Sequence, residues 1–211
     1  MNKENQNLIK VVKESKQKPY NVGSCRQAFL VKNLMLKTPK YSNKFSLFNS
    51  YNKLNREYIA YLQGIYQTLK EIQIWKENKF NDIIAPIEDY GIFEGQLYTL
   101  NKKIIPANIC LDEKDFDLEY FCQKMGCKNQ YALLLKRITS MSIFYNLDLY
   151  DLLDSEDNFG FDFVKNKILL LDYGCCEQNN YNKIDFLIKE NKKMFNMLFK
   201  EEQNNVYIQW A

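Results

Sequence analysis

The segment from Asn158 to Gly174 reads NFGFDFVKNKILLLDYG and carries the clearest local signal in the chain. Two apolar runs flank the polar turn Val164–Lys167, which is the pattern of a β-hairpin. Asn158 stands directly before the first run, and Asp172-Tyr173-Gly174 ends the second. The sequence therefore predicts two short strands with an amide side chain at the start of the hairpin and a carboxylate at its far end.

The composition predicts a well-packed protein. The 211 residues are 46% hydrophobic and include 15 Tyr and 14 Phe, which suffices for one domain or two small lobes. No apolar run approaches the roughly 20 residues that a membrane-spanning helix needs. The polar start, Met1–Asn7, lacks the apolar segment of a secretory signal. We therefore expect a cytoplasmic protein with no membrane partner.

Charged residues are nearly balanced. The chain has 29 Lys and Arg against 26 Asp and Glu, a net charge of +3, and no dense basic block. This distribution favours a solvated surface over a nucleic-acid footprint, so no nucleic-acid partner is expected.

The absence of histidine excludes several kinds of site. Without His there is no Cys₂His₂ or Cys₃His zinc site, and no Ser-His-Asp or Cys-His catalytic pair. The six cysteines have no spacing typical of a Cys₄ site and are interpreted as free cytosolic thiols. They are Cys25, Cys110, Cys122, Cys127, Cys175 and Cys176.

Strands dominate the first half of the sequence and helices the second, which predicts an α+β fold. The organisation expected is a polar N-terminal segment over 1–18 with a short helix near Leu8–Val12, a sheet-containing part over 19–102 and a helical part over 103–211. The hydrophobic patterns predict strands at 20–22, 28–31, 34–37 and 96–100, a loop and strand over 83–93 that Pro86 and Gly91 punctuate, and helices at 48–76, 116–125, 130–145 and 183–200.

In this order the elements resemble the protein-kinase-like superfamily, in a very small form such as those carried by phages and other mobile elements. The resemblance runs from Tyr20 to Gly174. It implies a minimal bilobal fold, with a small antiparallel-sheet N-lobe and a reduced helical C-lobe. It also implies ATP and Mg²⁺ as cofactors, and the host cytoplasm as the location if the chain is phage-encoded.

The resemblance assigns nucleotide-binding roles in the first half of the chain. Gly23-Ser24 occupies the place of the phosphate-binding glycine-rich loop, although only one glycine of that motif is present. Lys37, at the end of a strand, matches the lysine that contacts phosphates, and Glu57 on the following helix matches the glutamate that pairs with it. Thr99 to Lys102, including Asn101, matches the connector whose backbone binds the adenine edge.

In the second half the resemblance assigns the metal ligands and the catalytic acid. Asn158 and Asp172 match the Asn and the D-F-G Asp that hold Mg²⁺. Counting back from Asn158 at the usual spacing reaches Leu153, which has no acid group. Asp151 fits if the loop is two residues longer than usual, and Asp154 fits if it is one residue shorter. We prefer Asp151, because it follows the preceding helix more closely.

Three interpretations follow. The first is a minimal kinase that transfers a phosphoryl group from ATP to a hydroxyl of a protein or a small molecule. The second is a catalytically impaired pseudokinase that acts as a protein-binding module, which the missing glycines, the displaced Asp and the mere 37 residues after Gly174 favour. The third is an α+β protein in which Asp-Tyr-Gly is accidental.

Overall fold

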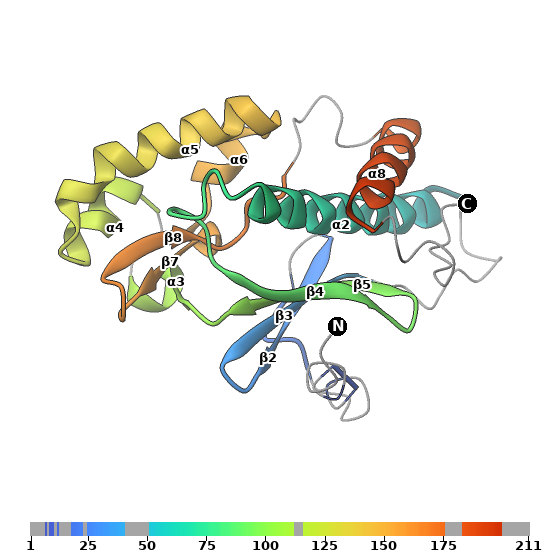
Figure 1. The fold of residues 1–211 in the computed structure, drawn as a ribbon, viewed down its shortest axis with the longest axis horizontal. Coiled ribbons are helices and arrows are strands. Elements are labelled where there is room, and N and C mark those ends of the chain that lie inside the picture. Colours follow the sequence, from blue (N-terminus) through green and yellow to red (C-terminus); the bar gives the residue numbers. More distant parts are fainter. Residues whose placement is uncertain are drawn as a thin grey trace. The chain divides into compact units, whose positions relative to one another are not determined.

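The computed structural model describes residues 18–22, 25–40, 51–111, 116–175 and 183–199 together with Asn7, Ile9, Lys10 and Val12, and of 21–22 and 51–55 only the backbone. The protein is α+β, as predicted. Its elements form two compact units, and each is described separately (Figure 1). Unit 1 comprises the described parts of Met1–Gln73, Ile87–Lys103 and Asn179–Ala211, and unit 2 comprises those of Ile74–Pro86 and Ile104–Gln178.

Unit 1 contains an antiparallel five-stranded sheet in the order β1-β2-β3-β5-β4. All five strands lie where the hydrophobic pattern predicted strands. In the loop and strand predicted over 83–93, the strand begins at Ile87, directly after Pro86, which cannot donate a ladder hydrogen bond. The bounds are β1 (Asn21–Val22), β2 (Arg26–Val31), β3 (Leu34–Pro39), β4 (Ile87–Phe93) and β5 (Gln96–Lys102).

The long predicted helix is present as α2 (Tyr51–Glu77). Leu62, Ile65 and Leu69 are almost completely buried and recur at helical spacing. Gly64 lies where α2 passes closest to the sheet. A Cβ atom on Gly64 would lie 2.4 Å from the main-chain oxygen of Cys25 and 3.1 Å from Cα of Pro39. The missing side chain therefore allows the helix backbone to approach the sheet closely.

The terminal helix α8 (Ile184–Leu198) belongs to unit 1 and lies beside α2 (Figure 1). Nδ2 of its buried Asn191 donates a 2.9 Å hydrogen bond to the main-chain oxygen of Leu62. The rings of Phe186 and Tyr66 lie 6.3 Å apart. The division of the chain therefore differs from the expected contiguous segments 19–102 and 103–211. Residues 183–199 join unit 1, and Ile74–Pro86 joins unit 2.

The described residues of the N-terminal segment 1–18 also contribute to unit 1. Asn7, Ile9, Lys10 and Val12 are helical, at the position of the expected short helix. Ile9 and Val12 are buried against Leu36 and Tyr98 of the sheet. This segment is therefore polar in composition but contributes two apolar side chains to the core.

Unit 2 combines helices with the predicted hairpin. The strands β7 and β8 pair with Phe159 opposite Leu170 and Asp162 opposite Lys167, and β6 adds a third strand. The bounds are β6 (Ile105–Pro106), α3 (Ala107–Cys110), α4 (Leu118–Lys124), η1 (Lys128–Gln130), α5 (Tyr131–Tyr145), α6 (Leu149–Leu153), η2 (Glu156–Asn158), β7 (Phe159–Asp162) and β8 (Lys167–Leu170). The predictions of the hairpin, α4 and α5 are confirmed.

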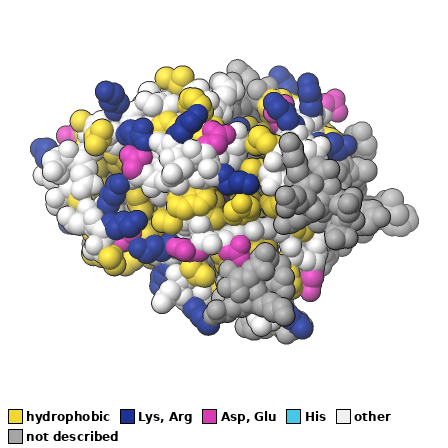
Figure 2. All heavy atoms as spheres, in the orientation of Figure 1, with side chains coloured by type: hydrophobic (Ala, Val, Ile, Leu, Met, Phe, Trp, Pro, Cys, Tyr) yellow, Lys and Arg dark blue, Asp and Glu magenta, His cyan; other side chains and the backbone are white. Residues whose placement is uncertain are grey.

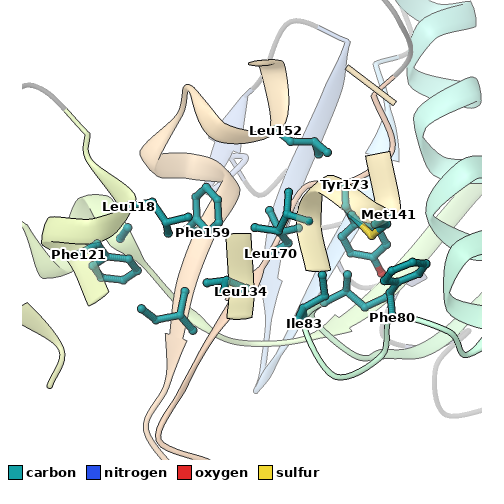
Figure 3. Close-up of a cluster of buried hydrophobic side chains, with 14 of the residues drawn as sticks. Phe80, Ile83, Leu118, Phe121, Leu134, Met141, Leu152, Phe159, Leu170 and Tyr173 are labelled. Carbon is teal, nitrogen blue, oxygen red and sulfur yellow. The ribbon is translucent and has the colours of Figure 1, made fainter. Parts of the chain in front are cut away.

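The core of unit 2 is built around this hairpin (Figure 3). Phe159 is completely buried, and its ring stacks on Phe116 at 5.2 Å. Leu170 and Tyr173 are also completely buried in this cluster. Residues on both sides of Asp172 are therefore fixed by packing, which holds the position of that acid in the unit.

Charged side chains are dispersed over the face shown in Figure 2, where basic groups lie among acidic and uncharged ones. In the described part of the chain, no helix combines the length and the apolarity required to cross a membrane.

Candidate functional site

Lys37 lies in the interior of the unit 1 sheet, between Ala28 of β2 and Thr99 of β5. Its Nζ atom is 3.3 Å from Oε1 of Glu71 on α2, and the Glu71 side chain is completely buried. A buried carboxylate needs a hydrogen-bonded cation to offset its desolvation. The strand lysine and the helix glutamate therefore form a structural ion pair, of the type that the resemblance implies.

Lys37 pairs with Glu71 and not with Glu57, the residue that we expected from the sequence. Glu57 and Glu71 are 14 residues apart on α2, which corresponds to about 21 Å along the axis and only about 40° around it. They therefore lie on nearly the same side of α2 but far apart along its axis, and Lys37 cannot reach Glu57 while it contacts Glu71. The predicted Lys37–Glu57 pair is wrong, because the sequence does not specify which turn of the helix faces β3.

Arg26 is a second cation on the same carboxylate and was not identified from the sequence. Its Nη2 atom is 2.9 Å from Oε1 of Glu71. The side chains of Arg26 and Lys37 are 6% and 13% exposed, so the whole cluster is shielded from water. The sequence did offer a signal, because Arg26 is a charged residue three positions after Gly23 and next to a predicted strand.

Thr99 and Asn101 are part of the sheet and not of a connector. Both are buried in β5, whose two edges pair with β3 and β4. The Thr99 hydroxyl donates a 2.8 Å hydrogen bond to Oδ1 of Asn101. The prediction that Thr99 to Lys102 forms an adenine-binding connector is therefore wrong, because the backbone of an interior strand is used by its neighbours. The chain leaves the sheet only after Lys102.

Gly23 and Ser24, the predicted phosphate loop, lie outside the described residues.

In unit 2 the structure brings Asn158 and Asp172 together at the open end of the β7–β8 hairpin. The main-chain N–H of Leu171, the residue before Asp172, donates a 2.7 Å hydrogen bond to the main-chain oxygen of Asn158. This bond extends the hairpin ladder by one step, so the two predicted metal ligands lie at the same end of the hairpin. The kinase-like order of Asn, hairpin and Asp had led us to expect these two residues at one site.

Asp151 also belongs to this group. It lies on α6, whose N-cap residue Asp148 accepts hydrogen bonds from the N–H groups of Tyr150 and Asp151. Nδ2 of Asn158 donates a 2.7 Å hydrogen bond to the main-chain oxygen of Asp151. The short helix was not predicted, since five residues are too few to show a helical period.

The carboxylates of this group influence one another. Partial burial, followed by the negative charges of Asp172 and Asp148, raises the pKa of Asp151, against the opposing effect of a hydrogen bond from Cys175. Asp154, the alternative acid, is the C-cap residue of α6 and is exposed, as Asp151 is, and of the named causes it contributes least to this shift. Asp151 therefore interacts electrostatically with Asp172.

Two further side chains hold the segment after β8. Tyr173 donates a buried 3.3 Å hydrogen bond to the main-chain oxygen of Ala85, and Cys175 donates one of 3.6 Å to that of Asp148. Burial, followed by the charges of Asp151 and Asp172, raises the pKa of the Cys175 thiol. Cys175 is therefore a neutral hydrogen-bond donor and not a nucleophile.

The residues present fit a magnesium ion that is shared with a phosphate ligand. The described residues include no cluster of three or more His, Cys, Asp or Glu side chains able to hold a metal by themselves. Mg²⁺, however, usually takes only one or two protein oxygens together with phosphates and water. The hydrogen bond from Nδ2 of Asn158 to Asp151 fixes the amide so that its Oδ1 atom points away from Asp151. Asn158 and Asp172 would then supply one oxygen donor each.

Comparison with known proteins does not assign a family, because neither the models of protein families nor the curated proteins match this sequence.

Proposed function

We propose that this protein is a small Mg²⁺- and ATP-dependent phosphotransferase with a minimal bilobal kinase-like fold. The observation that carries the proposal is the group formed by Asn158 at the end of η2, Asp151 on α6 and Asp172 just after β8, which a hydrogen bond, an extension of the hairpin ladder and a charge effect link to one another. Phosphoryl transfer requires oxygen ligands for a metal and an acid that orients the acceptor hydroxyl, and these are the groups present.

Unit 1 supports the same proposal independently. Lys37 lies on the third strand of an antiparallel sheet and is paired with Glu71 of the following helix. An ion pair between a lysine of the third strand and a glutamate of the next helix is a recurring part of kinase sites, where the lysine contacts phosphates. The pair here is buried, so its geometry is fixed before a ligand arrives.

Each residue has a defined role in the proposed reaction. In unit 1, Lys37 would bind phosphate oxygens of ATP, and in unit 2, Asn158 and Asp172 would hold the magnesium ion. The ion, when bound, neutralises negative charge on the phosphates as it develops in the transition state. Asp151 orients the acceptor hydroxyl and accepts its proton. The hydrogen bond from Asn158 keeps the backbone of Asp151 in place, so that the metal ligand and the acid are positioned together.

A thermal melt with and without Mg·ATP tests the proposal. Ligand at ~100 times its Kd should add about 2.7 kcal/mol of stability, a rise of roughly 5–10 °C for a chain of this size. Asp172→Asn should abolish the rise, because it removes the metal-binding charge. Asp154→Asn is the matched control, because it removes the same charge from an exposed position nearby and should retain the rise. A wild type that melts cooperatively and shows no rise would contradict the proposal.

A catalytically inactive binding module is the second candidate, and the position of Asp151 favours it. Asp151 lies seven residues before Asn158 and on a helix, whereas the kinase motif places the acid five residues before the Asn in a loop. Under this alternative Mg·ATP still stabilises the protein, but no phosphate is transferred. Incubation with γ-labelled ATP and a mixture of hydroxyl acceptors separates the two candidates.

A further inference from the structure

The side chain of Asn101 in β5 contains a buried hydrogen-bond donor that the sheet does not use. Asn101 is 2% exposed, and its Oδ1 atom accepts the 2.8 Å hydrogen bond from the hydroxyl of Thr99. Its Nδ2 atom is buried and has no hydrogen-bond partner among the described residues. Because a buried donor without an acceptor costs stability, such a group in a folded protein needs an explanation.

Thr99 determines which way this amide points. The two residues are two apart on β5, so their side chains share a face of the sheet. The single hydroxyl hydrogen of Thr99 is donated to Oδ1 of Asn101, and the nitrogen of the planar amide therefore faces away from Thr99. Both N–H groups of Nδ2 remain able to donate to an acceptor on that side.

The strand register places this donor on the same face as Lys37. In the β3–β5 ladder, Lys37 lies opposite Thr99 and Met35 lies opposite Asn101. Met35 and Lys37 are two residues apart, or about 7 Å along the strand. The amide of Asn101 is therefore a diagonal neighbour of the lysine that, under the proposed function, binds phosphate oxygens.

The Lys37 ammonium group extends away from Asn101. It contacts Glu71, which also contacts Arg26, and Arg26 lies opposite Pro39 at the far end of β3. The amide and the ammonium group are therefore separated along one face of the sheet. A nucleotide has the same arrangement, since its base and its phosphates are attached to different ends of the ribose.

We propose that Asn101 is a base-binding residue whose Nδ2 atom donates a hydrogen bond to an acceptor atom of the nucleotide base, while Lys37 binds the phosphates. Adenine offers ring nitrogens as acceptors, so ATP satisfies the donor. The side chain makes this contact, because the backbone of β5 is already paired with β3 and β4. The proposal rests on the proposed function for its ligand.

The neighbours of Asn101 allow a base to reach it. Met35 is half-buried, and its unbranched side chain with three rotatable bonds adapts readily to a new shape. Ala28, which lies opposite Lys37 on β2, is also half-buried. Apolar atoms of these residues give a flat ring a surface to pack on, and rotation of the Met35 side chain opens the way to Nδ2.

The affinity test divides the nucleotide into two halves. Adenosine carries the base without phosphates, and Mg·tripolyphosphate carries phosphates without a base. The double variant Thr99→Val/Asn101→Leu removes both polar groups with little change of shape, so it should fold at least as stably as wild type. Its Kd for adenosine should rise about fivefold, equivalent to one hydrogen bond, and its Kd for Mg·tripolyphosphate should stay within about twofold. Titrations followed by NMR measure both.

Asn191→Leu is the matched control. Asn191 is a completely buried asparagine of unit 1 with one bonded amide atom and one, Oδ1, without a partner in the described chain, but it lies on α8. This variant should bind both ligands as wild type does. A double variant with unchanged adenosine affinity would overturn the proposal. A loss confined to Mg·tripolyphosphate would also overturn it, because the amide would then bind phosphate.

A second measurement needs no variant of the sheet. In the ¹⁵N-labelled wild-type protein, adenosine should shift the side-chain amide hydrogens of Asn101 downfield, as expected when they form a hydrogen bond, and Mg·tripolyphosphate should not. This measurement decides the matter if the double variant does not fold. An Asn101 amide signal that stays in place when the protein is saturated with adenosine would reject the proposal.

Failure of this proposal and failure of the proposed function give different results. If adenosine binds through Asn101 but wild type binds no Mg·tripolyphosphate, the phosphotransferase proposal fails and the base contact stands. If Mg·tripolyphosphate binds and Asp172→Asn abolishes its binding, while adenosine binding is absent or independent of Asn101, the proposed function stands and the role of Asn101 is rejected.

Discussion

Asn158 donates a hydrogen bond from its side-chain nitrogen to the main-chain oxygen of Asp151 at 2.7 Å. This bond joins the start of the hairpin to helix α6 and spans seven residues of chain. It leaves the amide oxygen of Asn158 as the atom able to take a metal ion. One side chain thus has a structural contact on one side and a proposed ligand on the other.

Asn158→Ala should lower the free energy of unfolding by about 1 kcal/mol, because it removes this hydrogen bond. Urea unfolding measures the loss. Asn108→Ala is a suitable comparison, since Nδ2 of Asn108 donates a hydrogen bond of the same 2.7 Å length to Oδ1 of Asp157. Both bonds are exposed, but Asn158 is half-buried and bonds to the main chain, whereas Asn108 is exposed and bonds to a side chain. We therefore expect Asn108→Ala to cost less. Equal losses in the free energy of unfolding would show that the Asn158 bond stabilises the protein no more than the Asn108 bond does.

Asp151→Asn should stabilise the protein while it abolishes phosphoryl transfer. Asp151 is exposed on α6 but lies near the like charges of Asp172 and Asp148, so neutralising it relieves repulsion. Because solvent screens the charge of an exposed group, we expect a gain of less than about 1 kcal/mol, or a melting temperature at most about 2–4 °C higher. Calorimetry and a transfer assay measure the two effects. Asp154→Asn should change both less, and a reversed ranking would make Asp154 the reactive acid.

The Arg137–Asp82 pair should make a small, pH-dependent contribution to stability. Nε of Arg137 donates a 3.1 Å hydrogen bond to Oδ2 of Asp82. Burial would raise the pKa of Asp82, but the hydrogen bond and charge of Arg137 outweigh it and lower the pKa below 3.8. The contribution is therefore present above the unfolded pKa of about 3.9 and is lost as the pH falls through the lower folded value.

Asp82→Asn measures this contribution. Because the pair is partly exposed, we expect a loss of about 1 kcal/mol or less at pH 7, and the difference from wild type should shrink as the pH falls below 4. Urea unfolding at several pH values gives both quantities. A difference that stays constant from pH 7 to pH 3 would assign the effect to something other than the charge of Asp82.

Gly64→Ala should destabilise the protein, although alanine is the better helix former. The Cβ atom of the new alanine would lie 2.4 Å from the main-chain oxygen of Cys25, and a backbone atom cannot relieve the clash by a change of rotamer. We expect a loss of roughly 1–3 kcal/mol, as for overpacking in a core. Ala60→Gly in the same helix should cost about 0.5–1 kcal/mol through propensity alone. A neutral or stabilising Gly64→Ala would show that α2 can move from the sheet without cost.

Local elements were predictable because their hydrophobic patterns are strong. The β7–β8 hairpin, the long α2 helix and the strands of the sheet all follow from periodicity and turn residues, whereas the pairing of Asn158 with Asp172 came from the resemblance in motif order. These predictions needed no information on distant contacts.

The errors arose where a contact depends on the relative placement of two elements. Glu57 and Glu71 both face the same side of α2, and only the packing of helix on sheet selects Glu71. Arg26 was missed for the same reason. Thr99 and Asn101 were assigned to a connector because a strand that ends at 100 and one that ends at 102 have the same pattern. The five-residue helix that carries Asp151 is too short for periodicity to reveal.

The buried position of Tyr173 bears on how the activity of the protein could be controlled. Its ring is completely buried, and its hydroxyl is bonded to the main-chain oxygen of Ala85. Turning this residue outward would expose the ring and leave a buried carbonyl without that donor, at a cost of several kcal/mol. The carboxylate of Asp172 is thus held ready at all times. Under the proposed function, the described part of this segment would need no rearrangement before catalysis, so the output would follow how much of the protein the cell makes and when.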